Sequence, residues 1–135
     1  MSKPIQIHKF EQPIYPYTIW VAINKTPQFI SETFTEEDKS EIVFTEEDNH
    51  KAHAFTMTVM SKDKKEYGTL LYFRSKSSMT SKVIAHESVH AAKNLFKHIG
   101  ADIAPHEPFE YIVGWIAECC DEVRKWKNKT KVSSD

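Results

Sequence analysis

Little in this sequence points to a membrane or a nucleic acid. The 18 Lys and Arg residues nearly balance the 19 Asp and Glu residues, so the net charge of −1 gives no general attraction to nucleic acid or anionic lipid. The longest purely apolar run, 111–117, is far shorter than the roughly 20 residues of a spanning helix. The first residues, MSKPIQIHKFEQP, lack the apolar stretch and cleavage site of a signal peptide. We therefore expect neither a nucleic-acid nor a membrane partner.

Cysteine is also scarce, because the chain has only 2 cysteines, and these are the neighbours Cys119 and Cys120. Both fall in a helical pattern, where consecutive side chains diverge by about 100°. Such a pair is poorly placed for a mutual disulfide or a shared metal ion. We therefore expect the two thiols to pack in or near the core of a protein from a reducing cytoplasm.

The length of 135 residues and the hydrophobic content of 40% fit a single domain, 1–135, with one core. Its first part, 1–79, is mainly β, because it is rich in β-branched and aromatic residues broken by proline and polar clusters. We read 31–50 as a loop or short helix plus an exposed edge. The predicted strands are 16–23, 52–60 and 67–73, the last two joined by a turn at SKDKK. They predict an antiparallel sheet within 13–76.

The second part, 80–127, is helical and is followed by a short tail, 128–135. Thr80 or Ser81 can cap a helix that runs to about His98, with Gly100 as its end. A second helix is expected over 109–125. Its apolar stripe has helical spacing and consists of Ile112, Trp115, Ile116, Cys119, Val123 and Trp126. The expected class is therefore α+β.

The first of these helices contains the pattern HExxH, within AHESVHAAKNLFKHIG at 85–100. His86 and His90 are four residues apart and share one helix face, so both imidazoles can reach one zinc ion. Glu87 is displaced by about 100°, enough to miss the ion and yet reach a water bound to it as a general base. The expected buried stripe lies on the opposite side of the helix and consists of Ile84, Ser88, Ala91, Ala92, Leu95 and Ile99.

The alternative to a metal site is a solvated helix face that carries two idle histidines. Two features favour zinc over this alternative. The motif lies in the middle of a helix that has capping residues at both ends. A second helix then follows with two acidic residues, Glu107 and Glu110, that are candidates for a third ligand.

The segments IAHESVHAA and HIGADIAPHEPFEYIVGWIAE resemble the small gluzincin-type zinc metallopeptidases. They resemble more closely a group of short, uncharacterised proteins of bacteriophages and mobile elements. Those proteins combine a strand of the form YP-x-x-[IL]-W-[VI] with HE-x-x-HAA and a helix of the form E-P-x-A-Y-[LI]-x-G-[WY]. Here the strand is YPYTIWV at 15–21 and the helix begins EPFEYIVGW at Glu107, so the resemblance covers about 13–23 and 67–120.

This resemblance implies a zinc metallopeptidase that acts on a peptide or protein in the cytoplasm of a bacterial host. It also implies that the strand at 67–73 borders the cleft and accepts an extended peptide as an additional strand.

The third zinc ligand is left open between two glutamates. Glu107 matches the acidic position of the phage proteins and is preferred. Glu110 stands where those proteins have a small residue, yet it lies 20 residues after His90, the spacing of thermolysin-like enzymes. The glutamate that is not a ligand would be a helix N-terminal acid, stabilised by the helix dipole.

Tyr111 and His106 are weaker candidates, each for steadying the oxyanion or orienting the ligand. The alternative for each is a half-exposed surface residue.

Three functions remain open at this point. The first is a zinc-dependent peptidase. The second is a zinc-stabilised protein that binds a host protein without catalysis, and the third is a small structural protein without metal.

Overall fold

A computed structural model of the protein describes residues 6–15, 17–24, 26–45, 47, 53–100 and 107–126. The fold is α+β. The strands are β1 (Gln6–Glu11), β2 (Thr18–Ile23), β3 (Phe34–Thr35), β4 (Ala54–Ser61) and β5 (Tyr67–Phe73). The α-helices are α1 (Ile30–Thr33), α3 (Ser81–Ile99) and α4 (Glu107–Lys125), and short 3-10 turns lie at Pro27–Phe29 and Lys76–Ser78. The predicted tail, 128–135, lies outside the described residues.

The five strands form one sheet in the order β1-β2-β5-β4-β3. The expected antiparallel sheet is wrong at one pairing, because β2 and β5 run parallel while the other neighbours are antiparallel. The β4–β5 hairpin sets the direction of β5, which then enters the sheet between β4 and the distant β2. The sheet also begins earlier than residue 13, because β1 pairs along its whole length with β2.

The parallel pairing of β2 and β5 depends on Gly68. A Cβ atom at this position would lie 2.3 Å from the main-chain oxygen of Thr18 and 2.7 Å from the ring of Trp20. Real Cβ atoms essentially never approach another atom that closely. The lack of a side chain at Gly68 therefore allows the first residues of β2 and β5 to meet.

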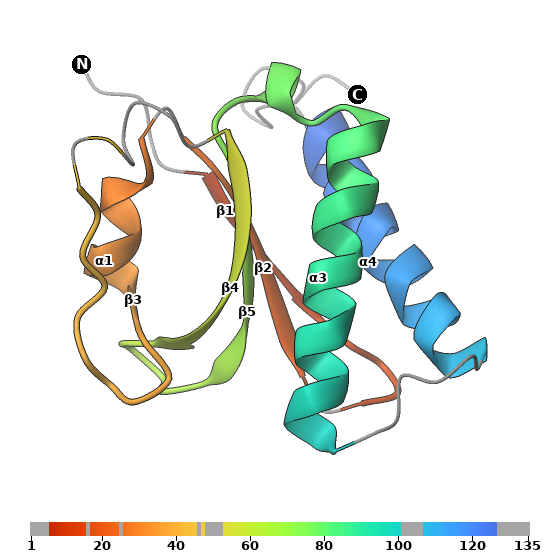
Figure 1. Ribbon diagram of the computed structural model, residues 1–135, viewed down its shortest axis with the longest axis horizontal. Helices are drawn as coiled ribbons and strands as arrows, with labels where there is room; N and C mark the ends of the chain where they lie inside the picture. The colour runs from red at the N-terminus through yellow and green to blue at the C-terminus, as the bar shows by residue number, and fades with distance from the viewer. Residues whose placement is uncertain are drawn as a thin grey trace, which may run out of the picture.

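Both faces of the sheet are covered, as Figure 1 shows, by α3 and α4 on one side and by α1 with its neighbouring segments on the other. Along β2 and β5, alternate residues point to the two faces and join two separate hydrophobic clusters. The helix side holds Ile19, Val21, Leu71 and Phe73. The other side holds Trp20, Ala22, Leu70 and Tyr72.

The helices follow the sequence prediction closely. Thr80 caps α3 by accepting a hydrogen bond from Val83 N at 3.2 Å, and Gly100 ends the helix with a φ of 73°. The predicted stripe of α4 is buried at Ile112, Ile116, Cys119 and Val123, while Trp115 and Trp126 are half-buried. Within the described part of the chain, no helix is long and apolar enough to cross a membrane.

Cys119 and Cys120 are free and buried, which confirms that they belong to the core. Burial raises the pKa of both thiols to about 12. The two thiols are therefore protonated at neutral pH.

Candidate metal centre

His86 and His90 lie one turn apart on the outer side of α3, and both are exposed. Their Nε2 atoms are 3.2 Å apart. Two nitrogens that bind one zinc ion at about 2.0–2.1 Å in tetrahedral geometry are separated by roughly 3.3 Å. The two rings thus already have the spacing that a shared zinc ion requires, and imidazole is a ligand type that zinc prefers.

The opposite side of α3 is the buried one, as its sequence predicts. Ile84, Ala91 and Leu95 are 5%, 0% and 0% exposed and pack in the cluster between α3, α4 and the sheet. Because this side is filled by apolar contacts, the two histidines lie on the solvent side of the helix, where their rings contact each other.

The burial of Glu87 differs from the prediction. This residue was expected to lie off the buried side, but it is only 7% exposed. Its Oε1 accepts a hydrogen bond of 2.6 Å from the hydroxyl of Thr56 on β4. The helical spacing from His86 was correct, but β4 lies beside the flank of α3 on which Glu87 stands. The same flank therefore contacts the sheet instead of water.

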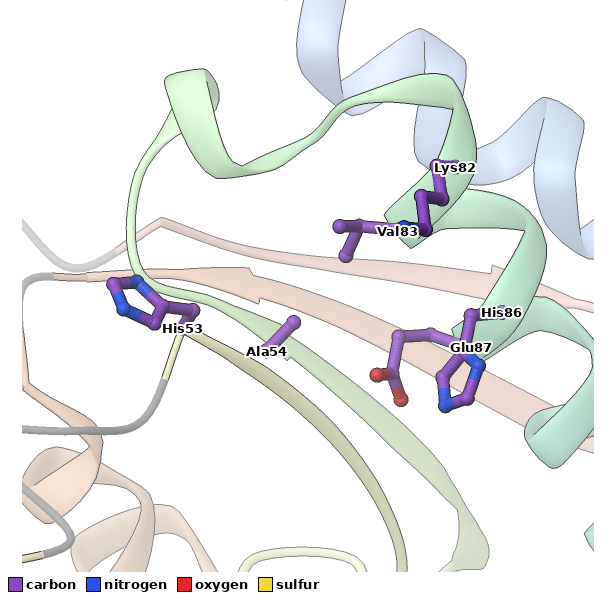
Figure 2. A pocket seen from close by; sticks show the side chains of 6 residues that line it. All are labelled: His53, Ala54, Lys82, Val83, His86 and Glu87. Carbon is purple, nitrogen blue, oxygen red and sulfur yellow. The ribbon is translucent and has the colours of Figure 1, made fainter.

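A pocket of about 250 Å³ opens between this flank of α3 and the start of β4. Figure 2 shows the carboxylate of Glu87 beside the ring of His86, on the side of the sheet. The lining residues are His53, Ala54, Lys82, Val83, His86 and Glu87. Glu87 is thus mostly buried and yet borders a space that a small group can enter.

His53 also lines this pocket, and no motif in the sequence points to it. It is exposed and directly precedes β4. Only the pairing of β4 beside α3 brings His53 to the same pocket as His86, and nothing in the local sequence signals that pairing.

The third ligand is not found among the described residues, where no three His, Cys, Asp or Glu side chains form a group able to hold a metal. Glu110 is exposed near the start of α4. Its neighbour Phe109 contacts Phe96, with ring centroids 5.3 Å apart. Phe96 lies six residues beyond His90, about 9 Å along the helix axis. The beginning of α4 therefore lies beside the C-terminal half of α3.

The flank of α3 that meets α4 also differs from the flank that carries Glu87. Phe96 follows Glu87 by nine residues, which is about 900° of rotation and places the two on opposite flanks. Tyr111 lies about 200° round α4 from Phe109 and is 49% exposed, so its ring points away from α3. Glu110 and Tyr111 are thus not brought to the histidines. The side chain of Glu107 and all of His106 fall outside the described residues, so their roles stay predictions.

The expected peptide-binding edge at 67–73 is wrong, because β5 lies inside the sheet between β2 and β4. The open edge near the pocket belongs to β4. In the part of the chain that the structure describes, β4 has a strand partner on its outer side only at Met60 and Ser61.

Two main-chain hydrogen bonds show which groups of β4 face this edge. Arg74 N donates to His53 O at 2.8 Å, and Ser61 N donates to Glu66 O at 2.9 Å. Odd-numbered residues of β4 bond toward β5. The N–H and C=O groups of Ala54, Thr56 and Thr58 consequently point outward.

Comparison with protein-family models, curated proteins and solved structures found no match. The site itself is therefore the basis on which a function can be assigned. Its parts are two neighbouring imidazoles, a glutamate that borders a pocket, and a strand edge beside that pocket that lacks a strand partner among the described residues.

Proposed function

We propose that the protein is a zinc-dependent metallopeptidase, with His86 and His90 as two ligands of the ion. The observation that carries this proposal is the 3.2 Å separation of the two Nε2 atoms, beside the pocket that Glu87 borders. Zinc in such a site supplies Lewis-acid activation of water and of a peptide carbonyl. Glu107 is the preferred third ligand, and Glu110, which this structure does not bring to the histidines, is the alternative.

In this proposal Glu87 is the general base. Thr56 engages Oε1, and the other carboxylate oxygen accepts no hydrogen bond from the described residues. This second oxygen can take a proton from the attacking water and deliver it to the leaving amine. Tyr111 and His106 stay candidates for the oxyanion, although the outward orientation of Tyr111 does not support its role.

The proposed substrate is an extended segment of a peptide or protein. Such a segment can add to the outward N–H and C=O groups of β4, which gives main-chain recognition with little dependence on side chains. The pocket beside Ala54 and His86 would then receive one side chain or the scissile group.

A second function is favoured by the burial of Glu87. A glutamate that is 7% exposed and whose carboxylate bonds to Thr56 has a structural reason to be present without any chemistry. The protein would then be a zinc-stabilised module that binds a host protein and hydrolyses nothing.

The metal content of protein purified without added metal is the first test, and we expect one zinc per chain. Digestion of a peptide library, followed by mass spectrometry, then separates the two functions. We expect cleavage by the wild type that a chelator abolishes and that Glu87→Gln lacks, although the variant keeps its zinc. Cleavage that persists in Glu87→Gln would indicate a contaminating protease. A zinc-loaded wild type that cleaves nothing would favour the binding module.

The choice of third ligand has its own test. Glu107→Ala should weaken zinc binding much more than Glu110→Ala, which serves as the matched control from the same helix turn. Titration with a competing chelator measures both affinities. Loss of zinc in Glu110→Ala with retention in Glu107→Ala would assign the ligand to Glu110 instead.

A further inference from the structure

The hydroxyl of Thr56 is the polar contact that joins β4 to Glu87 of the HExxH motif. It lies 2.6 Å from the carboxylate Oε1 of Glu87 and 3.3 Å from the main-chain oxygen of the same residue. A threonine hydroxyl has a single proton to donate. The shorter contact and the charge of the carboxylate assign that proton to Oε1.

The position of Thr56 follows from the alternation of β4. Ala54, Thr56 and Thr58 share the face that meets α3, while Phe55 and Met57 pack in the cluster on the other face. Ala54 has no donor, and Thr58 makes no hydrogen bond to Glu87. Within this strand, Thr56 alone bonds the carboxylate.

Packing alone does not explain a threonine at this place, because valine has the same shape and would fill the same volume. What valine lacks is the donor. A carboxylate as buried as that of Glu87 needs a hydrogen bond to offset its lost hydration. The donor also restricts rotation of the carboxylate, since it holds one of the two oxygens against the strand.

We propose that Thr56 is a positioning residue, whose hydroxyl holds the carboxylate of Glu87 in the orientation that a general base at this site requires. This inference rests on the proposed peptidase function for its catalytic consequence. The geometric part, that Thr56 fixes the carboxylate, stands apart from turnover.

The test compares Thr56→Val, which keeps the shape and removes the donor, with Thr56→Ser, which keeps the donor. Thr58→Val is the matched control on the same face of β4, because it changes only a side chain that does not bond Glu87 and leaves the outward main-chain groups of residue 58 in place. In Thr56→Val we expect kcat to fall on the order of 10- to 100-fold, the loss typical of a misplaced catalytic group, with KM and zinc content unchanged. Thr56→Ser should restore most of kcat, and Thr58→Val should resemble the wild type.

A second readout does not need activity. The side-chain carboxyl carbon of Glu87 gives an NMR resonance that is assigned by its disappearance in Glu87→Gln. We expect this resonance to shift in Thr56→Val and to stay near its wild-type position in Thr56→Ser and Thr58→Val.

An unshifted resonance in Thr56→Val, or equal losses of kcat in Thr56→Val and Thr58→Val, would overturn the positioning role. A zinc-loaded wild type that cleaves no peptide would defeat the proposed function, and the resonance would then decide the role of Thr56. If Thr56→Val does not fold, the serine variant decides, because a shifted resonance in a variant that keeps the donor contradicts the proposal.

Discussion

On the inner side of α3, Ala91 and Leu95 are completely buried, whereas His86 and His90 on the outer side of the same helix are exposed. Apolar contacts with the sheet and α4 explain the residues of the inner side. Nothing in the packing explains the outer pair, since any polar residue would satisfy an exposed helix face. The inner side thus holds residues that folding requires, and the outer side holds two histidines that packing does not require.

Glu87 lies at the border of these two sides and belongs to both. Its burial and its bond to Thr56 tie it to the sheet, while the pocket exposes it to small molecules. A residue at such a border cannot be assigned to folding or to chemistry by position alone. Variants on each side of α3 separate the two contributions.

The largest expected effect on folding is on the inner side, at Leu95. Leu95→Ala should lower the free energy of unfolding by about 2–5 kcal/mol, because it removes buried methyl groups and leaves a cavity. Denaturant unfolding monitored by circular dichroism measures this change. Lys93→Ala, on the exposed side nearby, is the control and should change stability by no more than about 0.5 kcal/mol.

The second-largest effect on stability is expected in the sheet, against which the inner side of α3 packs. Gly68→Ala should cost about 1–3 kcal/mol, because its Cβ would meet the main chain of Thr18 at 2.3 Å and push β2 from β5. Gly114→Ala is the matched control on α4, where a Cβ would meet nothing within 4 Å. Alanine is the better helix former, so this control should be neutral or stabilising by up to about 1 kcal/mol. Equal thermal midpoints for both variants would contradict the close approach of β2 and β5.

The sequence predicts the helices and the hairpin well, because local signals define them. Thr80 and Gly100 mark the ends of α3 through their side chain and backbone, and the strand at 67–73 matches β5 in both bounds. The outward direction of His86 and His90 also follows from helical spacing alone. These features depend on residues close together in the chain.

The features that were missed depend on residues far apart. The parallel pairing of β2 with β5 joins segments about 50 residues apart, and no local pattern encodes a strand's partner or its direction. The burial of Glu87 and the inclusion of His53 in the pocket both arise from the placement of β4 beside α3. A helical wheel gives the angle of Glu87, but it cannot say what lies at that angle.

A smaller effect on stability is expected at the start of α3, where the N-cap stabilises the helix as a whole. Thr80→Ala should cost about 1 kcal/mol, because Val83 N loses the acceptor it has at 3.2 Å. Ser81→Ala, one residue later, is the control and should stay within about 0.5 kcal/mol. Unfolding midpoints of the two variants in urea measure the difference. The reverse order would place the cap at Ser81.

The smallest effect on the metal-free protein is expected on the outer side. His86→Ala and His90→Ala should each change its free energy of unfolding by about 0.5 kcal/mol or less, because both side chains are exposed. The stability gained on adding zinc, by contrast, should differ between the wild type and the two variants. A ligand that binds only the folded state at 100 times its Kd adds about 2.7 kcal/mol of stability. We expect such a gain in the wild type and its loss in both variants.

Urea unfolding with a chelator and with buffered zinc measures both quantities on the same samples. His98→Ala is the matched control, since His98 is an exposed histidine on the same helix, two turns beyond His90. It should keep the zinc response even if its contact with the ring of Tyr17, at 5.0 Å between centroids, adds a little stability. An undiminished zinc response in His86→Ala or His90→Ala would remove the proposed site. A large loss of stability in either variant under chelation would instead mean that the outer side, like the inner one, is explained by folding.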